Sequence, residues 1–205
     1  TQTLGIQKTS DGIEATLAPV DDPSKTEKRT ADKALVAIGV QGRFEGLWDS
    51  GLAVEIFKDH IKVDKQTYQT SVPGIYAVGD VIGPPWLAHV ASEEAIVCVE
   101  QLAGHHAEPV DYSAIPGCTY CHPQIASVGL TEAKAKEAGY EVKVGMFPFI
   151  GNGKAIALGE AEGFTKTVFD AKTGELLGAH MIGAEVTEMI QGYTIGKTLE
   201  TTEAE

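Results

Sequence analysis

The chain has 205 residues, enough for one medium domain or two small ones. Its 16 basic and 29 acidic residues give a formal net charge of −13, and a surface this negative repels phosphate backbones and anionic lipid, so nucleic acid and membranes are poor candidate partners. No signal peptide or membrane-length apolar run is visible, and three cysteines do not form a disulfide framework. We therefore expect a cytoplasmic protein, or one of the mitochondrial matrix if the source is eukaryotic.

The first forty residues read as β-rich. Residues 12–17 alternate between apolar and polar over a few positions, and the polar segment 21–24 is a strong turn signal. The continuous apolar run 34–38, which ends at Gly39, is typical of a strand buried on both faces of a parallel sheet. The start of the chain therefore predicts several strands.

The next seventy residues predict short strands followed by one helix. Residues 61–64 favour a half-buried strand, and the apolar run 75–78 favours a second buried strand that leads directly into Gly79 and Asp80. After a Gly-Pro-Pro turn, apolar residues recur at helical spacing until Gly104 closes the helix. The residues of this expected helical face are Ala88, Ala91, Ala95, Val99 and Leu102.

Beyond a polar connector, 105–116, the pattern changes to an antiparallel α+β arrangement. Thr131 is the expected N-cap of a short helix that ends at Gly139, and residues 170–174 are the expected turn between the last two strands. The final segment favours a helix with one apolar face. Strands are expected at 119–128, 140–144, 164–169 and 176–182, and the apolar face consists of Val186, Met189, Ile190 and Tyr193.

Two motifs that resemble cofactor-, metal- or phosphate-binding sites are better explained as ordinary structural elements. Cys118, Cys121 and His122 match a haem-attachment pattern, and the two cysteines match a thiol redox or zinc half-site. No second cysteine pair exists, however, and residues three apart in a strand point to opposite faces, so we predict two small buried strand residues. Residues 192–198 resemble a phosphate-binding loop but are one residue short and lie in a helical pattern.

Two weaker motifs are also interpreted as structural and not as binding sites. The glycine-rich segment 151–154 has no strand–helix frame around it and is expected to be a turn. His89, Glu93 and Glu94 lie within about one helical turn and could suggest metal ligands, but this spacing is common on solvated helix faces. We therefore expect no metal site.

The strongest constellation is the segment from Gly79 to the start of the following helix at Ala88. An acid placed directly after a buried strand stands where such a strand opens onto a ligand crevice, and Asp80 can accept hydrogen bonds from ligand hydroxyls. The N-terminus of the helix carries unpaired N–H groups and partial positive charge. These features favour a polyol-bearing cofactor; the alternative is that Asp80 simply caps the helix.

The segment 70–81 resembles the second FAD-binding motif of the flavin-dependent pyridine nucleotide–disulfide oxidoreductases. Matches to this family continue along essentially the whole chain in the family's order. Ala37–Gly39 with Arg43 resemble the closing strand of the NAD-binding domain. Leu87–His89 with Glu93 and Glu94 resemble the helix aimed at the flavin. The segments that resemble the dimerisation domain are His122–Glu132 and Leu177–Ala184, with Thr187 and Glu188.

The resemblance implies an α/β plus α+β fold: remnants of NAD- and FAD-binding Rossmann-like domains, followed by an α+β dimerisation domain. The implied segments are 1–41 for the NAD remnant, 42–110 for the returning part of the FAD domain and 111–205 for an incomplete dimerisation domain.

The implied cofactors are FAD and NAD. By resemblance, Asp80 binds the ribityl hydroxyls of FAD, the backbone of Leu87, Ala88 and His89 approaches the flavin ring, Gly39 lies beside NAD, and Thr3 touches the adenine side. Trp86 stands where the family often has Met.

Within the family, residues 39–43 and 147–160 most resemble the members that oxidise dihydrolipoamide to lipoamide with NAD, the E3 components of 2-oxo acid dehydrogenase complexes. The implied partners are a second copy of the chain and the lipoyl domains of those complexes. Rival interpretations are a disulfide reductase of the mercuric or glutathione type, a dimerisation module without activity, and a haem-binding protein.

The departures from the family pattern concern the chemistry itself. The first FAD motif, the glycine-rich turn of the NAD domain, the redox cysteine pair and the catalytic His and Glu do not occur in the sequence. No catalytic residue is therefore assigned. The sequence begins with Thr1 in a strand-like segment and ends at Glu205 in a helical pattern without a cap, so we expect a chain truncated at both ends.

Overall fold

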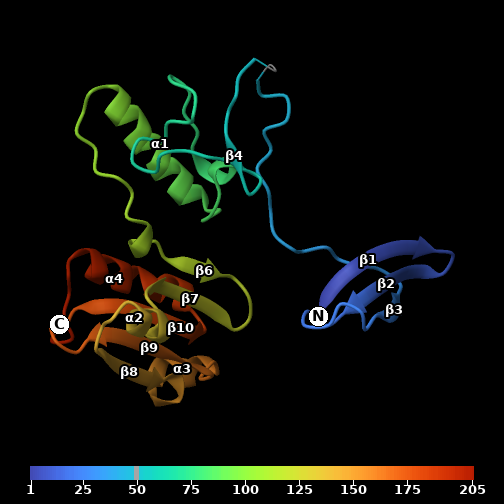
Figure 1. Ribbon diagram of the computed structural model, residues 1–205. Helices are drawn as coiled ribbons and strands as arrows, with labels where there is room; N and C mark the ends of the chain where they lie inside the picture. The colour runs from blue at the N-terminus through green and yellow to red at the C-terminus, as the bar shows by residue number, and fades with distance from the viewer. Residues whose placement is uncertain (49–50) are drawn as a thin grey trace. The chain divides into compact units, whose positions relative to one another are not determined.

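The computed structural model describes residues 1–48 and 51–205 (Figure 1). The chain divides into two compact units, Thr1–Gln41 and Gly42–Glu205. The described residues form three separate sheets, of three, five and two strands. No helix within the described residues is long and apolar enough to cross a membrane.

The first unit is a three-stranded antiparallel sheet, which confirms the β-rich start of the chain. Its strands, in the order β1-β2-β3, are β1 (Gln2–Thr9), β2 (Gly12–Ala18) and β3 (Glu27–Ala31). Gly12 has φ +143°, and a Cβ there would lie 2.4 Å from the carbonyl oxygen of Ala31, so the tight approach requires glycine. The predicted turn before β3 also forms, because Asp22 accepts hydrogen bonds from the backbone and hydroxyl of Ser24.

The predicted buried strand at 34–38 is wrong. This segment forms no strand, and the side chains of Leu35 and Ile38 are 94% and 95% exposed. A parallel strand satisfies its backbone groups only through neighbouring strands on both sides. The described residues of this unit supply only the three antiparallel strands, which already pair among themselves. The apolar run therefore lies exposed.

The first part of the second unit contains a small hairpin, two helical elements and a hydrophobic core. The elements are β4 (Ile56–Phe57), β5 (His60–Ile61), the 3-10 helix η1 (Gly79–Ile82) and α1 (Ala88–Leu102). The core is centred on the fully buried ring of Tyr68 and includes Ile61, Ile82, Val97 and Cys98. These residues join the hairpin and η1 to the inner face of α1.

Two strand predictions in this part need correction. Residues 75–78 form no strand; only Tyr76 makes an isolated bridge, to Gln69, and the run is half-buried. Of the predicted strand 61–64, only Ile61 belongs to a regular strand, while Val63 makes one isolated bridge to Thr70. As in the first unit, the buried-strand pattern is present but the described neighbours are too few for a parallel sheet.

Helix α1 has the predicted extent but buries a different face. Its buried residues are Val90, Glu94, Val97 and Cys98. Val99 and Leu102, which belong to the predicted apolar face, are exposed. A helix that is apolar on several sides is typical of one that packs against more than one neighbour. The core around Tyr68 covers one of these faces.

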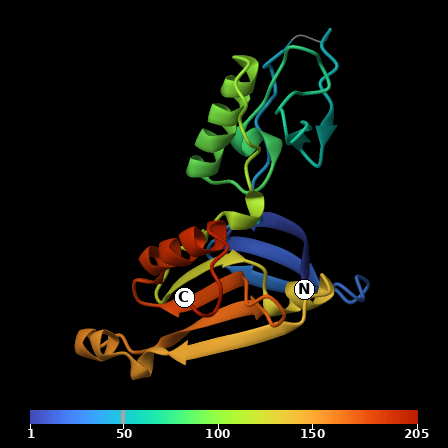
Figure 2. The same cartoon turned by 90° about the vertical axis from the view of Figure 1, so that its left-hand side faces the viewer.

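The second part of this unit is a five-stranded antiparallel sheet in the order β6-β7-β10-β9-β8. Its strands are β6 (Gly117–Thr119), β7 (Gln124–Gly129), β8 (Val142–Pro148), β9 (Gly163–Asp170) and β10 (Leu176–Gly183). Helix α4 (Val186–Thr198) packs on β7 and β10, as Figure 2 shows. The core beneath it is formed by Ala126, Val128, Phe149, Ala179, Met181, Val186 and Ile190.

The local signals in this part are largely confirmed. The Thr131 hydroxyl accepts a hydrogen bond from the backbone N–H of Lys134 and caps α2 (Glu132–Glu137). The turn between β9 and β10 is closed by Gly174, whose N–H donates to the carbonyl of Asp170 at 2.8 Å. Residues 192–198 lie inside α4, which agrees with the rejection of a phosphate loop.

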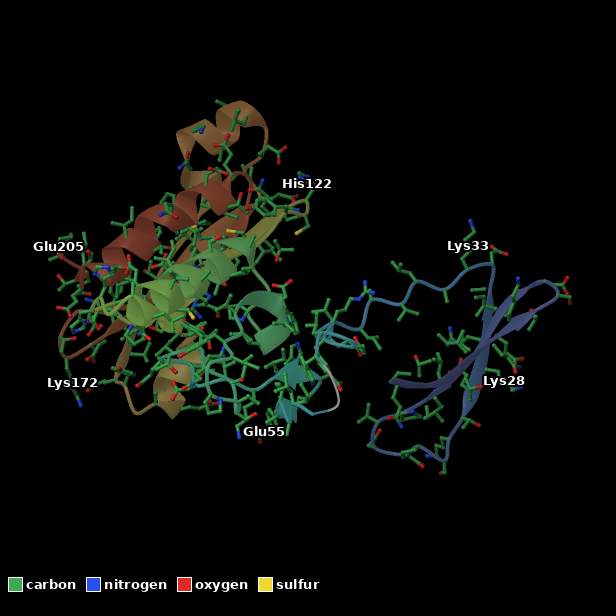
Figure 3. All side chains as sticks on the ribbon, turned by 90° about the horizontal axis from the view of Figure 1, so that it is seen from above. Lys28, Lys33, Glu55, His122, Lys172 and Glu205 are labelled. Carbon is green, nitrogen blue, oxygen red and sulfur yellow. The ribbon has the colours of Figure 1, made fainter. Side chains whose placement is uncertain are left out.

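Other boundaries differ from the prediction. The predicted strand 119–128 is two strands, β6 and β7, and the turn between them carries His122 (Figure 3). The predicted strand 140–144 begins at Val142 and runs on to Pro148. The segment 151–154 is not a simple turn, because it joins the 3-10 helix η3 (Phe149–Gly151) to the short helix α3 (Gly153–Leu158), whose first N–H groups bond to Asn152.

The predicted apolar face of α4 lies mainly in the core and partly at the surface. Val186 and Ile190 are fully buried against the chain's own sheet, and Tyr193 is partly buried against the same core. Met189 remains exposed. The stripe is therefore mainly a core contact, and one member of it reaches the surface.

Candidate functional site

The turn that presents Asp80 is shaped by Gly79. The chain enters η1 from Val78 in an extended conformation, and Gly79 then adopts φ +77°. A Cβ at Gly79 would lie 3.1 Å from the Cβ of Ala91 on α1. Because both the left-handed conformation and the close approach favour glycine, this position holds η1 tightly against α1.

The carboxylate of Asp80 is free to bind a ligand. The residue is exposed, and among the described residues no side-chain hydrogen bond involves its carboxylate. The alternative that Asp80 caps the following helix is wrong, because the N-cap of α1 is Leu87 and no side chain caps the helix. All four lone-pair sites of the two carboxylate oxygens are thus open to donors from outside the chain.

The N-terminus of α1 presents uncapped donors near this turn. Leu87 is extended, with φ −134° and ψ 128°, and no acidic residue occurs in the first helical turn. The first intrahelical bond runs from the Ala91 N–H to the carbonyl of Leu87 at 3.0 Å, which leaves the N–H groups of Ala88, His89 and Val90 without helical partners. Together with the helix dipole they favour negative charge on a bound group.

Glu94 lies buried behind the turn, so the sequence-based assignment of this acid to a solvated helix face is wrong. Glu94 is 2% exposed, and its Oε2 accepts a hydrogen bond from the Gly79 N–H at 2.7 Å. Its Oε1 accepts a hydrogen bond from the Tyr112 hydroxyl at 2.6 Å and lies 3.9 Å from the ammonium of Lys65. His89 and Glu93, the other members of the weak metal motif, are both exposed. Glu94 is therefore a structural anchor of the Gly79 turn.

The surroundings of Glu94 keep the hydroxyls of Tyr112 and Tyr68 protonated. Burial and the hydrogen bond to Glu94 raise the pKa of Tyr112 well above its usual range, so its hydroxyl stays protonated. Burial also raises the pKa of Tyr68, whose hydroxyl lies 3.3 Å from that of Tyr112. Burial lowers the pKa of Lys65, and the charge of Glu94 partly offsets this. The ammonium of Lys65 also lies over the Tyr112 ring, 4.9 Å from its centroid.

Trp86 lies just before the start of α1 and packs on His60. Their rings are stacked with centroids 5.8 Å apart, and the indole N–H donates to Nε2 of His60 at 3.3 Å. The other ring nitrogen, Nδ1, lies 2.7 Å from the carbonyl of Lys58, so this nitrogen carries the proton when Nε2 accepts. The pair fixes the segment that leads into Leu87.

The structure brings together four of the six predicted cofactor residues. Asp80 on η1 and the segment Leu87, Ala88 and His89 lie on two elements that pack together in the second unit. Thr3 and Gly39 belong to the first unit. Thr3 is an exposed position of β1 paired with Leu17, and Gly39 has φ +118° in an irregular, exposed segment.

The cysteines do not form a redox or metal centre within the described ranges. All three are free thiols, and their environments differ: Cys98 is buried in the core, Cys118 is half-buried, and Cys121 is exposed. The prediction that Cys121 is a buried strand residue is wrong, because it lies in the β6–β7 turn with its sulfur 3.0 Å from the carbonyl oxygen of Pro123. The described residues contain no cluster of three or more ligand-type side chains suited to a metal ion.

Models of known protein families match most of the chain. Residues 4–95 match the family model of pyridine nucleotide-disulphide oxidoreductase, and residues 115–205 match the model of that family's dimerisation domain. The chain is 53% identical over 201 residues to dihydrolipoyl dehydrogenase of Rhizobium etli and 43% identical over 197 residues to that of Bacillus subtilis. These alignments cover 98% and 96% of this chain, and the chain spans 41% of the length of either relative.

Solved structures match the fold of this chain over almost its whole length. LpdA of Mycobacterium tuberculosis matches 98% of this chain with 42% of its own length, at a TM-score of 0.83 and 22% sequence identity. The flavoprotein disulfide reductase RclA of Escherichia coli, solved as a Cu(II) complex, also matches 98% of this chain at a TM-score of 0.83, with 44% of its own length and 21% identity. The two family models together span the Asp80 turn, the first half of α1 and the five-stranded sheet, so the chain belongs to the pyridine nucleotide-disulphide oxidoreductase family and comprises part of its Rossmann-like domain and its dimerisation domain.

Proposed function

We propose that the chain is the cofactor-holding and dimer-forming portion of a dihydrolipoyl dehydrogenase. The parent protein would oxidise dihydrolipoamide to lipoamide with NAD, through FAD and a redox disulfide. The observation that carries the proposal is the free Asp80 carboxylate, held on a glycine turn beside the uncapped N-terminus of α1. The high identity to dihydrolipoyl dehydrogenases along 98% of the chain supports this member of the family.

The residues of this turn fit a flavin dinucleotide. The Asp80 carboxylate offers only acceptors and would hold the ribityl hydroxyls, each of which is a donor. The backbone of Leu87, Ala88 and His89 would face the ring system, where the free N–H groups of the helix start stabilise negative charge. The flavin, when bound, supplies electron transfer between the thiol substrate and the nicotinamide. The chain's own residues bind and orient it.

The first unit would carry Gly39 beside NAD and Thr3 on the adenine side. Gly39 has a positive φ of 118°, and a Cβ added to it would meet no atom within 4 Å, so a nucleotide can approach its backbone closely. Thr3 would contribute from the exposed face of β1. Both assignments rest on the family resemblance of the sequence. The cytoplasm, or the mitochondrial matrix, is the proposed location.

A second copy of the chain is the proposed partner of the five-stranded sheet. A groove of about 380 Å³ lies between β8, β9 and α4, and its lining includes the exposed Met146, Phe147 and Met189. Ile150, in the neighbouring η3, is also exposed. An apolar surface of this kind marks an interaction site, and the matching of this segment to a dimerisation domain favours a symmetric homodimer. Lipoyl domains of 2-oxo acid dehydrogenase complexes are the proposed further partners.

The proposal is tested by the substrate preference of the complete flavoprotein that contains this sequence. We expect dihydrolipoamide oxidation with NAD to exceed the reduction of glutathione disulfide or mercuric ion with NADPH by about 100-fold in kcat/KM, because the thiol site and the nucleotide site both discriminate. Steady-state rates with each substrate pair provide the measurement. A preference for glutathione disulfide or mercuric ion would replace the proposed function with one of the rival reductase activities.

A further inference from the structure

The network around the buried Glu94 carboxylate, behind the Gly79 turn, has no place in the cofactor contacts proposed above. It consists of Glu94, Tyr112, Tyr68 and Lys65, which come from α1, from the 3-10 helix η2 (Tyr112–Ala114) and from the segment before η1. Burying a carboxylate costs free energy unless donors and cations surround it. Here two hydrogen-bond donors and one cation do so, and the network occupies the point at which the three segments meet.

We infer that Glu94 is a positioning residue for the cofactor acid, and that Tyr112 holds Glu94 in place. This inference rests on the proposed role of Asp80 in binding FAD. The N-cap residue of η1, Val78, provides no side-chain cap, and Glu94 supplies the missing acceptor to the first N–H of η1 from a different element. The peptide between Val78 and Gly79, directly before Asp80, is thereby fixed to α1, whose N-terminus forms the other half of the proposed flavin contact.

Tyr112 determines the orientation of the Glu94 carboxylate. Its hydroxyl has a single hydrogen, which is donated to Oε1 of Glu94, so the hydrogen between the two tyrosines comes from Tyr68. The direction of every hydrogen bond in the network is therefore defined: Tyr68 donates to Tyr112, Tyr112 donates to Glu94, and Glu94 accepts from Gly79. With its two carboxylate oxygens engaged at 2.6 and 2.7 Å, the Glu94 carboxylate is held between both donors.

The network also links the cofactor turn to the dimerisation segment. Tyr112 is the first residue of η2, and η2 packs against β7 and α4 of the five-stranded sheet. Folding of that sheet thus supports the position of the turn that carries Asp80. By thermodynamic linkage, a bound flavin stabilises the same contacts in return.

The substitutions Glu94→Gln and Tyr112→Phe test the inference in the complete flavoprotein. Glutamine keeps the shape of the side chain but directs an NH₂ group at one of the two donors, so we expect the FAD dissociation constant to rise about tenfold. Tyr112→Phe removes one hydrogen bond and should raise it about fivefold. Glu93→Gln, the same change at the exposed neighbouring position, is the matched control and should leave the constant within about twofold.

A double variant distinguishes a positioning role from a general structural one. If Glu94 acts through the Asp80 turn, Glu94→Gln should change the dissociation constant less than about twofold when Asp80→Ala is already present, since coupled residues are not additive. Amide hydrogen exchange without flavin provides a second measurement, and the peptide covering Gly79 should exchange about tenfold faster in Glu94→Gln.

The outcomes separate the two proposals. If Asp80→Ala leaves FAD binding unchanged, the proposed cofactor site fails and the inference fails with it. If Asp80→Ala weakens FAD but Glu94→Gln does not, or if the two effects simply add, the site stands and the positioning role is overturned. Should Glu94→Gln yield no folded protein, Tyr112→Phe replaces it in the same comparison with Asp80→Ala.

Discussion

Replacing Ile190 with alanine should lower the free energy of unfolding by about 2–5 kcal/mol, the usual cost of removing a large buried aliphatic side chain. Ile190 is 1% exposed on α4 and belongs to the core between that helix and the five-stranded sheet. Truncation leaves a cavity lined by side chains from two layers, which cannot close without moving the helix. Urea unfolding followed by circular dichroism measures the difference.

The matched control is Ile195→Ala on the same helix. Ile195 is 51% exposed, so the same chemical change removes little buried area and should cost less than about 1 kcal/mol. Measurements at two protein concentrations identify any part of either effect that comes from association. Equal losses for the two variants would contradict the assignment of Ile190 to the core.

The 205-residue polypeptide by itself should neither oxidise dihydrolipoamide nor retain FAD, and it should self-associate. Thiol exchange needs two accessible, adjacent cysteines, whereas Cys98 is buried, Cys118 is half-buried and only Cys121 is exposed. The proposed flavin contacts of this chain are limited to the Asp80 turn and the N-terminus of α1. Val99 and Leu102, on the outer face of α1, are exposed apolar side chains.

Three measurements on one purified sample test this expectation. We expect no flavin absorbance, no reduction of NAD by dihydrolipoamide above the background rate, and a solution mass above that of the 21.7 kDa monomer. Self-association follows from the exposed Met146, Phe147 and Met189 at the groove beside α4 and from the exposed run 34–38. A yellow and active monomer would overturn this part of the account.

Sequence patterns predicted the elements whose stability is local. The helix 88–102, the Thr131 cap and the turn 170–174 depend on residues within one or two turns of chain, and all three are present in the structure. The two predicted parallel strands, 34–38 and 75–78, depend on distant neighbours and are absent among the described residues. Their apolar runs predict burial, but a parallel strand is buried only by neighbouring strands and helices, which a local pattern does not contain.

The candidate site also combines features that a local sequence pattern predicts with contacts between distant residues that it does not. Asp80 and the start of α1 could be predicted because a glycine and an acid precede a helix at a short distance. Glu94 could not, because charged residues are seldom buried and its neighbour Glu93 is exposed. Its partner Tyr112 is 18 residues away and carries no motif. Only the three-dimensional structure reveals that Glu94 contacts the Gly79 turn.

The central claim is tested most directly by titrating FAD into the flavin-free complete protein carrying Asp80→Ala. We expect the free energy of FAD binding to weaken by about 1–3 kcal/mol, or ~5- to 150-fold in the dissociation constant, because the ribityl hydroxyls lose their acceptor. Glu100→Ala removes the same charge from an exposed position of α1 and should bind FAD as the unaltered protein does. Equal dissociation constants for Asp80→Ala and the unaltered protein would contradict the assignment of this turn to the flavin.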